Sequence, residues 1–375
     1  MEYTIHNQVL LLVFVIAMVM GAIVNKTNFC TMGAVSDWVN MDDTGRLRAW
    51  LFAMAVALIG VLGLEAAGTI NLNAGTFPPY RTENFAWLRY LLGGLMFGVG
   101  MTLASGCGNK TLVRIGGGNL KSLVVLIIAA TFSYLMLWTE FYEKFFNAWI
   151  AASSISLAKA GMQSQDLGAI IGGLAGKQNT GTLHLAVGAV VALGLVAFAF
   201  ASTEFRGSFD NVLAGLVIGL AIVAGWYVTG GSMGQAWKEW AEMAAEMPSR
   251  VEVQSFTFIS PMGDSVRYLM NPGRLAQVNF GVVALAGVIA GSFVYALLSG
   301  RFRFEWFASA GDFLNHAFGG VLMGIGGVLS MGCTIGQAIT GVSTLAIGSI
   351  LTFVAIVAGA SATMKFQYRQ MMRAE

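Results

Sequence analysis

Three cysteines, Cys30, Cys107 and Cys333, are the residues of this sequence whose type and placing suggest chemistry. Each follows a long apolar run and opens a segment of small residues. A thiol is a weak S–H donor and a soft, polarisable neighbour, which suits a large reduced-sulfur ligand better than a hard oxyanion. The three thiols therefore favour a path lined by sulfur over the plainer interpretation as small buried hydrophobes.

The surroundings of Cys107 and Cys333 repeat each other. The first reads Ser-Gly-Cys-Gly-Asn-Lys from Ser105, and the second reads Met-Gly-Cys-Thr-Ile-Gly from Met331. Glycines that precede the two cysteines match at a constant offset of 226 positions, and the pairs are Gly93 and Gly319, Gly94 and Gly320, Gly98 and Gly324, Gly100 and Gly326, and Gly106 and Gly332. Such spacing indicates an internal repeat, and small residues on one helix face let neighbouring backbones approach closely.

Polar and small residues around the cysteines complete a candidate substrate path. Besides the three cysteines its members are Asn28, Thr31, Gly106, Gly108, Asn109, Lys110, Gly332, Thr334 and Gln337. Helix N-termini beyond the glycine-rich breaks, together with Lys110 and Arg114, would compensate the charge of an anion. The two cations are equally explained as anchors at the inner membrane surface.

The sequence argues against a metal site or a cofactor. It has no Cys-x-x-Cys pair and three histidines, His6, His184 and His316, whereas zinc and iron–sulfur sites usually need four ligands at recognisable spacing. A disulfide framework is disfavoured because one thiol would be left over. No block of like charge suggests a nucleic-acid partner.

The elements that must position these residues are membrane helices. Of 375 residues 56% are hydrophobic and 11% are charged, against about 25% charged in a soluble domain. We therefore predict an all-α polytopic membrane protein in a lipid bilayer, with short re-entrant helices and about nine spans. Apolar windows place the spans at 8–25, 49–68, 88–104, 122–138, 184–201, 211–228, 276–298, 312–330 and 344–362.

Basic residues in short loops set the orientation. Lys365, Arg369 and Arg373 near the carboxyl end, with Lys26 and Lys110, favour a cytoplasmic C-terminus and a periplasmic N-terminus in an inner membrane. The first span lacks a basic leader and a cleavage site, so we interpret it as a retained helix. Glu65, at the outer end of the second span, is interpreted as an end residue that reaches the surface rather than as part of an entrance.

With nine spans, Cys107 and Cys333 are approached from opposite sides, so the repeat is inverted. We predict a first half over 1–183 with spans one to four and an outer loop, a linking span over 184–210, and a second half over 211–375, all in one membrane domain. Irregular backbone is tolerated at membrane depth where it is buried in protein or lines a cavity, so the two glycine-rich breaks are interpreted as re-entrant loops. Inverted halves with interrupted helices are typical of transporters.

The three cysteine motifs together resemble the YeeE/YedE family of sulfur-transport membrane proteins, over nearly the whole chain. They are Asn28-Phe29-Cys30-Thr31, the Ser105–Asn109 stretch and the Ser330–Gln337 stretch. The resemblance implies an hourglass-shaped inner-membrane protein that takes thiosulfate into the cytoplasm. It also implies that Cys30, Cys107 and Cys333 pass the anion along by transient S–H hydrogen bonds. Other members are linked to different sulfur or selenium metabolism.

Two functions stay open at this point. The first is a non-enzymatic transporter for thiosulfate or a related sulfur anion. The second is a membrane thiol carrier in which a cysteine persulfide hands sulfane sulfur onward, with a cytosolic sulfur-carrier protein as its partner. An ion channel is disfavoured because the sequence has no filter-like motif or ring-forming charges.

Overall fold

The computed structural model describes residues 4–176, 181–244 and 246–374. These residues are mostly helical; the strands among them are β1, Asn84–Phe85, and β2, Ile155–Ser156, which form one antiparallel pair. The predicted all-α class is therefore confirmed. The predicted outer loop over 139–183 includes residues 177–180, and the predicted chain ends include 1–3 and 375, all of which lie outside the described residues.

Eight helical stretches in the described part of the chain are long and apolar enough to span a membrane. The long helices in them are α1 Thr4–Thr27, α3 Gly45–Ala66, α4 Trp87–Leu103, α6 Leu120–Trp138, α9 Gly181–Phe200, α11 Phe209–Gly230, α14 Phe280–Leu298 and α16 Ile347–Ala374. Each overlaps a predicted span. The chain is a multi-pass membrane protein.

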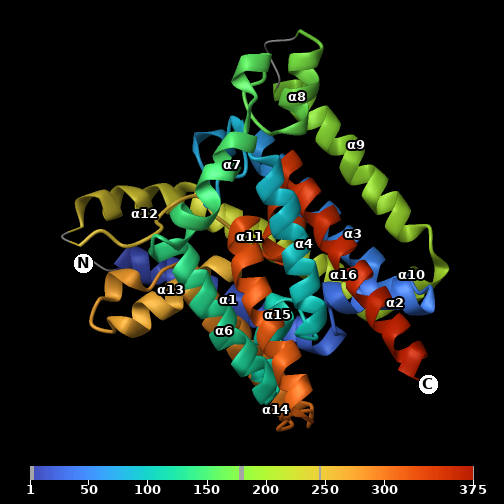
Figure 1. Cartoon of the computed structure of the whole chain (residues 1–375). Helices are drawn as coiled ribbons and strands as arrows, with labels where there is room; N and C mark the ends of the chain where they lie inside the picture. Colours follow the sequence, from blue (N-terminus) through green and yellow to red (C-terminus); the bar gives the residue numbers. More distant parts are fainter. Residues whose placement is uncertain (1–3, 177–180, 245, 375) are drawn as a thin grey trace.

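The ninth predicted span, 312–330, is the helix α15, Ala310–Leu329, which is not among those eight. It has 20 residues, but polar groups in its first turns lower its hydropathy, and Asp312 and His316 are two of them. The Asp312 carboxylate pairs with Lys121 at 3.0 Å. The helix α15 packs along α4 and α6 in the middle of the structure (Figure 1). It is therefore part of the same helix bundle as the eight apolar stretches.

Shorter helices connect the long ones. The α-helices are α2 Thr31–Met41, α5 Gly108–Gly116, α7 Ala148–Ser153, α8 Leu167–Leu174, α10 Thr203–Gly207, α12 Ser232–Met243 and α13 Ile259–Met270. The 3₁₀ turns are η1 Leu72–Ala74, η3 Ala158–Ala160, η4 Leu275–Gln277 and η6 Val342–Thr344, and the π-helices are η2 Glu143–Asn147 and η5 Ile335–Gly341. Three of these short elements, α2, α5 and η5, follow the three cysteines.

The glycines found in the repeat let α4 and α15 cross in close contact. A Cβ atom added at Gly93 would lie 2.9 Å from the Gly326 carbonyl oxygen, and one added at Gly100 would lie 2.8 Å from that of Gly319. Since the earlier glycine of α4 meets the later glycine of α15, the two helices run antiparallel. Their backbones approach in the way that small residues allow in membrane proteins.

Helices from the two ends of the sequence alternate in the bundle. The helix α1 packs on α14 and α3 packs on α11, while α4 packs on α15 and α16, and α15 packs on α6. Figure 1 shows α6, α15, α4 and α16 side by side at its centre. The core is therefore built jointly from early and late helices.

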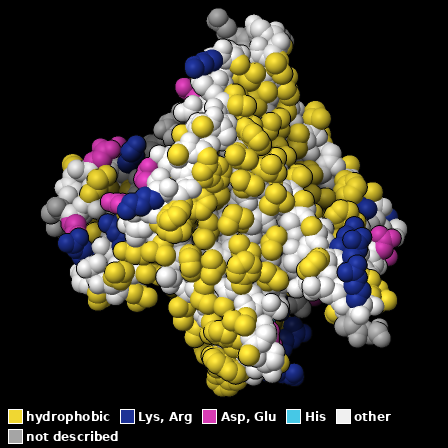
Figure 2. Space-filling view, viewed as in Figure 1, with side chains coloured by type: hydrophobic (Ala, Val, Ile, Leu, Met, Phe, Trp, Pro, Cys, Tyr) yellow, Lys and Arg dark blue, Asp and Glu magenta, His cyan; other side chains and the backbone are white. Residues whose placement is uncertain are grey.

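The outer faces of the long helices are apolar. Val190 and Leu193 of α9 are 71% and 65% exposed, and α9 runs along one edge of the body in Figure 1. Figure 2 shows hydrophobic side chains over most of one face, with Lys, Arg, Asp and Glu gathered toward its margins. This is the surface that a lipid bilayer covers.

Candidate functional site

Each cysteine lies at the start of a helix, two residues after a left-handed backbone turn. The turn residues before Cys30, Cys107 and Cys333 are Asn28, Ser105 and Met331, whose φ angles are 53°, 57° and 63°. A non-glycine residue with positive φ is uncommon, so three at one offset from a cysteine mark a shared local design.

The carbonyl of each cysteine accepts a first helical hydrogen bond. The N···O distances are 2.9 Å from Ala34 to Cys30, 2.9 Å from Thr111 to Cys107 and 2.8 Å from Gln337 to Cys333. The Cys30 sulfur also accepts a hydrogen bond from the Gly33 amide at 3.5 Å. All three thiols therefore lie at helix N-termini, where amide groups and the helix dipole favour negative charge.

The three thiols come from distant parts of the sequence into one buried row. They are free and are 4%, 1% and 0% exposed at Cys30, Cys107 and Cys333. The side chains of Cys30 and Cys107 contact each other, and Cys107 also contacts Thr334. A Cβ atom added at Gly108 would lie 3.8 Å from the Cys333 Cβ. Cys107 therefore touches Cys30 directly and meets the Cys333 segment through Thr334, and the three thiols are referred to below as the row.

Buried polar atoms without a well-formed hydrogen bond gather around this row. Among the described residues they include Thr31 Oγ1, both side-chain polar atoms of Asn109, Thr334 Oγ1, Gln337 Oε1 and Thr257 Oγ1. Thr334 and Thr257 do contact the Cys107 and Cys333 thiols, but sulfur is a weak partner. An unsatisfied buried polar group costs about 1–3 kcal/mol, so such a group of them is typical of a site that receives a polar ligand.

Asn28 and Lys110 mark the Cys30 end of the row. Lys110 Nζ donates to Asn28 Oδ1 at 2.8 Å, and Arg114 donates to the Ser105 carbonyl oxygen at 2.7 Å. A Cβ atom added at Gly106 would lie 3.4 Å from Lys110 Cβ and 3.9 Å from Arg114 Nη1, so both cations stand beside the break. The structure thus brings Asn28, Lys110 and the break at Gly106 together at the Cys30 end.

Two residues that sequence reasoning missed cover the Cys333 end. Tyr80 is 2% exposed and donates from its hydroxyl to the Gly336 carbonyl oxygen in η5 at 2.6 Å. Burial raises the pKa of Tyr80 well above its usual value, so the hydroxyl keeps its proton. Thr257 contacts the Cys333 thiol from the loop before α13. Both lie in loops, and no periodicity of the sequence connects them with a cysteine.

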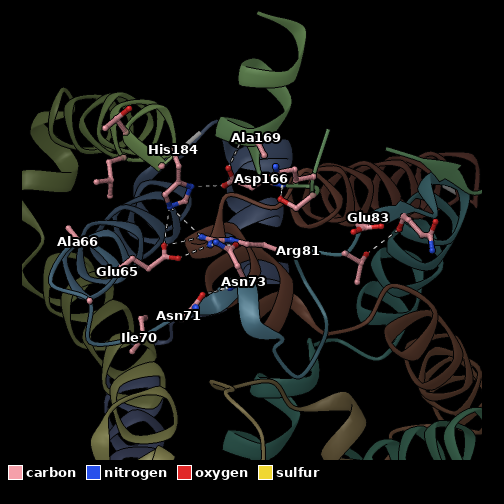
Figure 3. Close-up of a pocket in the computed structure, with 18 residues that line it drawn as sticks. Glu65, Ala66, Ile70, Asn71, Asn73, Arg81, Glu83, Asp166, Ala169 and His184 are labelled. Atoms are coloured by element: carbon pink, nitrogen blue, oxygen red, sulfur yellow. Dashed lines mark hydrogen bonds and ion pairs between the residues drawn. The ribbon is translucent and has the colours of Figure 1, made fainter. Parts of the chain in front are cut away.

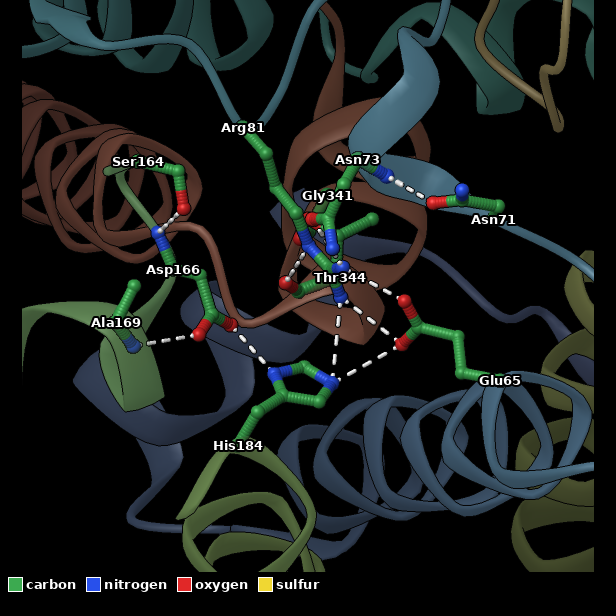
Figure 4. Close-up of polar contacts among 10 residues, drawn as sticks. All are labelled: Glu65, Asn71, Asn73, Arg81, Ser164, Asp166, Ala169, His184, Gly341 and Thr344. Carbon is green, nitrogen blue, oxygen red and sulfur yellow. Dashed lines mark hydrogen bonds and ion pairs between the residues drawn. The ribbon is translucent and has the colours of Figure 1, made fainter. Parts of the chain in front are cut away.

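A cavity of about 1130 Å³ opens at the ends of α3 and α9, and Arg81, the residue after Tyr80, lines it (Figure 3). Glu65 pairs there with Arg81, with Nη1–Oε1 at 2.6 Å and Nη2–Oε2 at 3.0 Å. His184 contacts Glu65 at 3.0 Å and Asp166 at 2.7 Å. Figure 4 shows the four side chains converging from four segments of the chain.

The interpretation of Glu65 as a surface-reaching end residue is wrong. Its side chain is 12% exposed and is held by Arg81 and His184. A lone ionisable residue near a span end looked like an anchor because its partners are 16 and 119 positions away. The sequence signal available was that Glu65 and His184 both lie at ends of predicted spans.

Comparison with known proteins gives one family and two relatives. A family model described as sulphur transport matches residues 26–362. The chain is similar to the thiosulfate transporter TsuA of Escherichia coli, with 25% identity over 329 residues that cover 85% of this chain and 84% of the relative. It is also similar to the thiosulfate transporter TsuA of Spirochaeta thermophila, with 23% identity over 356 residues that cover 90% and 93%.

Proposed function

Because the chain belongs to the sulphur-transport family, we propose that it carries thiosulfate or a closely related reduced-sulfur anion across the membrane without acting as an enzyme. The observation that carries the proposal is the buried row of Cys30, Cys107 and Cys333 with unsatisfied polar atoms around it. The printed names of the two relatives support the choice of anion.

The chemistry of the row fits the two ends of thiosulfate. The terminal sulfur is large and soft and accepts weak S–H hydrogen bonds, while the three oxygens accept stronger bonds from hydroxyl and amide groups. Asn109, Thr334 and Thr31 supply such groups beside the thiols. Helix N-termini at the three cysteines offset part of the anion's charge along the row.

The direction of travel follows from the proposed orientation. The anion enters at Cys333, passes Cys107 and leaves at Cys30, where Lys110 is the nearby cation. Lys26, Lys110 and the basic end of α16 support a cytoplasmic inner side in a bacterial inner membrane. The helix breaks before Cys107 and Cys333 then act as re-entrant loops.

We expect reporters fused after Glu375 to be cytoplasmic and a tag placed before Met1 to be accessible from the periplasm. The physical reason is the excess of Lys and Arg in short loops on that side. Paired fusions that are active in the cytoplasm and in the periplasm, respectively, measure this. Two ends on the same side would contradict both the orientation and the odd number of spans on which the inverted repeat rests.

The inverted repeat and its halves, 1–183 and 211–375 with 184–210 between them, are part of the same proposal. Support comes from hydrogen bonds that match at the 226-residue offset. Gly106 N donates to Met101 O at 2.8 Å, and Gly332 N donates to Gly327 O at 2.8 Å. Each half then contributes one glycine-rich break to the centre, with Cys107 in the first and Cys333 in the second, as in transporters built from inverted repeats.

We expect Lys110→Gln to lower thiosulfate uptake several-fold, since a cation beside the row loses its charge while its length is nearly kept. Lys365→Gln, on the exposed end of α16, is the matched control because it removes a basic residue away from the row. Initial rates in proteoliposomes measure the effect. If the two variants lose equal activity, Lys110 is an anchor at the membrane surface and not part of the path.

The contact between Cys30 and Cys107 favours a second candidate, the covalent carrier. A persulfide on Cys107 would be within reach of the Cys30 thiol, which would take the outer sulfur and pass it to a cytosolic sulfur-carrier protein. This candidate needs the Cys107 thiolate to attack the outer sulfur of thiosulfate, which breaks the sulfur–sulfur bond and releases sulfite, whereas the transporter leaves the ion intact.

Uptake of labelled thiosulfate into proteoliposomes of the purified protein tests the transporter. A tenfold excess of sulfate, which has the oxygens but not the soft terminal sulfur, should leave the rate nearly unchanged. Empty liposomes give the leak rate. Absence of uptake above the leak, or equal competition by sulfate, would contradict a path selective for reduced sulfur.

A further inference from the structure

The cavity at the ends of α3 and α9 has a charge pattern that does not suit an anion. Its titratable side chains are Glu65, Arg81, Glu83, Asp166 and His184, three acids against one permanent cation. The side chains of Arg81 and Asp166 are 4% and 6% exposed. These charged groups are therefore buried together and are not separate charges on the surface. A thiosulfate dianion that crosses this cavity therefore depends on whatever balances the carboxylates.

The geometry of His184 shows what balances them. Its Nδ1 lies 2.7 Å from Asp166 Oδ2, and its Nε2 lies 3.0 Å from Glu65 Oε2. A neutral imidazole has one donor and one acceptor nitrogen, and an acceptor would repel an ionised carboxylate. Two carboxylate contacts therefore require one proton more than a neutral histidine between two ionised acids.

The extra proton belongs on the imidazole. Glu65 accepts two hydrogen bonds from the Arg81 guanidinium, and Asp166 Oδ1 accepts the Ala169 amide at 2.8 Å as the N-cap of α8. Hydrogen bonds of this kind stabilise the ionised carboxylate. With an imidazolium, the two carboxylates are balanced by Arg81 and His184; without it, the four side chains carry one net negative charge.

Among the described residues, no charged side chain other than Arg81 and His184 balances the carboxylates of Glu65 and Asp166. Glu83 is on the cavity wall beyond Arg81 as seen from His184 (Figure 3). The remaining charged groups on elements packed against α9 are at its opposite end, where Arg48 and Arg206 donate to the Phe198 and Phe200 carbonyls. The long contact between Arg81 Nη2 and His184 Nε2, at 3.4 Å, adds a cation beside the ring.

The same side chains hold the segment that follows the Cys333 helix. Arg81 Nε donates to the Thr344 carbonyl oxygen at 3.0 Å, at the end of η6, the turn that follows η5 (Figure 4). The Leu167 amide next to Asp166 donates to the Leu345 carbonyl at 3.0 Å. Tyr80, the neighbour of Arg81, bonds to Gly336 inside η5. The cluster and the segment that begins at Cys333 are therefore joined by direct hydrogen bonds.

We propose that Glu65, His184 and Asp166 form a proton-binding site on the outer face, and that its proton admits the anion to the Cys333 end of the row. The proposal rests on the proposed transport function for its second part only. The bound proton neutralises the cluster and keeps Arg81 between Glu65 and Thr344. Its loss leaves Glu65, Asp166 and Arg81 with a net negative charge beside Glu83, which raises the repulsion of a dianion in the cavity, and it removes the His184 bond to one carboxylate.

The protonation state is measured without any transport. The chain has three histidines, so ¹⁵N-histidine labelling gives three imidazole groups, and His184→Gln identifies the signals of one. We expect both ring nitrogens of His184 to be protonated at pH 7, where an unperturbed histidine with a pKa of about 6.5 is mostly neutral. A neutral His184 ring at pH 7 would overturn the proton site, whatever the protein transports.

Uptake at fixed inner pH and varied outer pH tests the consequence. The wild type should lose about fivefold or more of its initial rate as the outer solution is made alkaline, a typical coupling between two sites. His184→Gln should transport with little dependence on outer pH. His316→Gln, in which a histidine bonded to Asp312 on α15 is replaced, is the control and should keep the wild-type profile. A His184→Gln profile identical to the wild type would refute the coupling.

Discussion

Replacement of Cys107 by serine is expected to lower thiosulfate uptake on the order of tenfold to a hundredfold while the protein stays folded. Cys107 contacts both Cys30 and Thr334, so in the proposed path the anion passes it between Cys333 and Cys30. A serine hydroxyl has a shorter bond to its Cβ and a harder oxygen, so it matches the terminal sulfur poorly. A loss of about 1.4–2.8 kcal/mol in one contact corresponds to that range.

The companion variants sharpen this prediction. Cys333→Ser should show a similar loss, and Cys30→Ser a smaller one, because Gly231 occupies the related position before α12 without a thiol. Size-exclusion profiles and initial uptake rates are measured for all three. Full activity in Cys107→Ser with normal folding would remove the thiol row from the transport mechanism.

The second large effect is on stability, and we expect Gly93→Leu to destabilise the protein by about 1–3 kcal/mol or to prevent its folding. A Cβ atom there would lie 2.5 Å from the Ser330 amide nitrogen and 2.9 Å from the Gly326 carbonyl oxygen. These are backbone atoms just before Cys333, so they cannot move aside as a flexible side chain does.

Gly194→Leu is the matched control, because a Cβ atom added at Gly194 of α9 meets nothing within 4 Å. Thermal unfolding in detergent, followed by tryptophan fluorescence, compares the two. Equal melting temperatures would mean that the close crossing of α4 and α15 does not hold the bundle together.

Much of this architecture could be predicted because its signals are local or strictly repeated. An apolar window such as 122–138 predicts a helix, and the structure has Leu120–Trp138 there. The glycine ladder indicated a close helix crossing, and Gly100 does lie against Gly319. The predicted span at 312–330 is the helix α15, but the polar residues around Asp312 keep it out of the eight candidate spans, although it packs against α4 and α6.

The rest could not be predicted because it depends on contacts between distant loops. Tyr80 reaches Gly336 across 256 positions, and His184 reaches Glu65 across 119. Loop residues follow no period that would relate them to a helix face, so Tyr80, Thr257 and Arg81 gave no signal. The local sequence identified the thiols and the helix starts beside them. The loop residues around Cys333 and the charged residues of the cavity could be recognised only from the fold.

The most direct test of the central claim follows the two sulfur atoms of thiosulfate separately. Proteoliposomes are supplied with thiosulfate labelled at either the outer or the inner sulfur, and label inside the vesicles is counted for the wild type and for Cys107→Ser. Passage of the intact ion along Cys333, Cys107 and Cys30 predicts that both labels enter at equal rates and fall together in the variant. Entry of the outer sulfur alone would contradict it and would establish the covalent carrier instead.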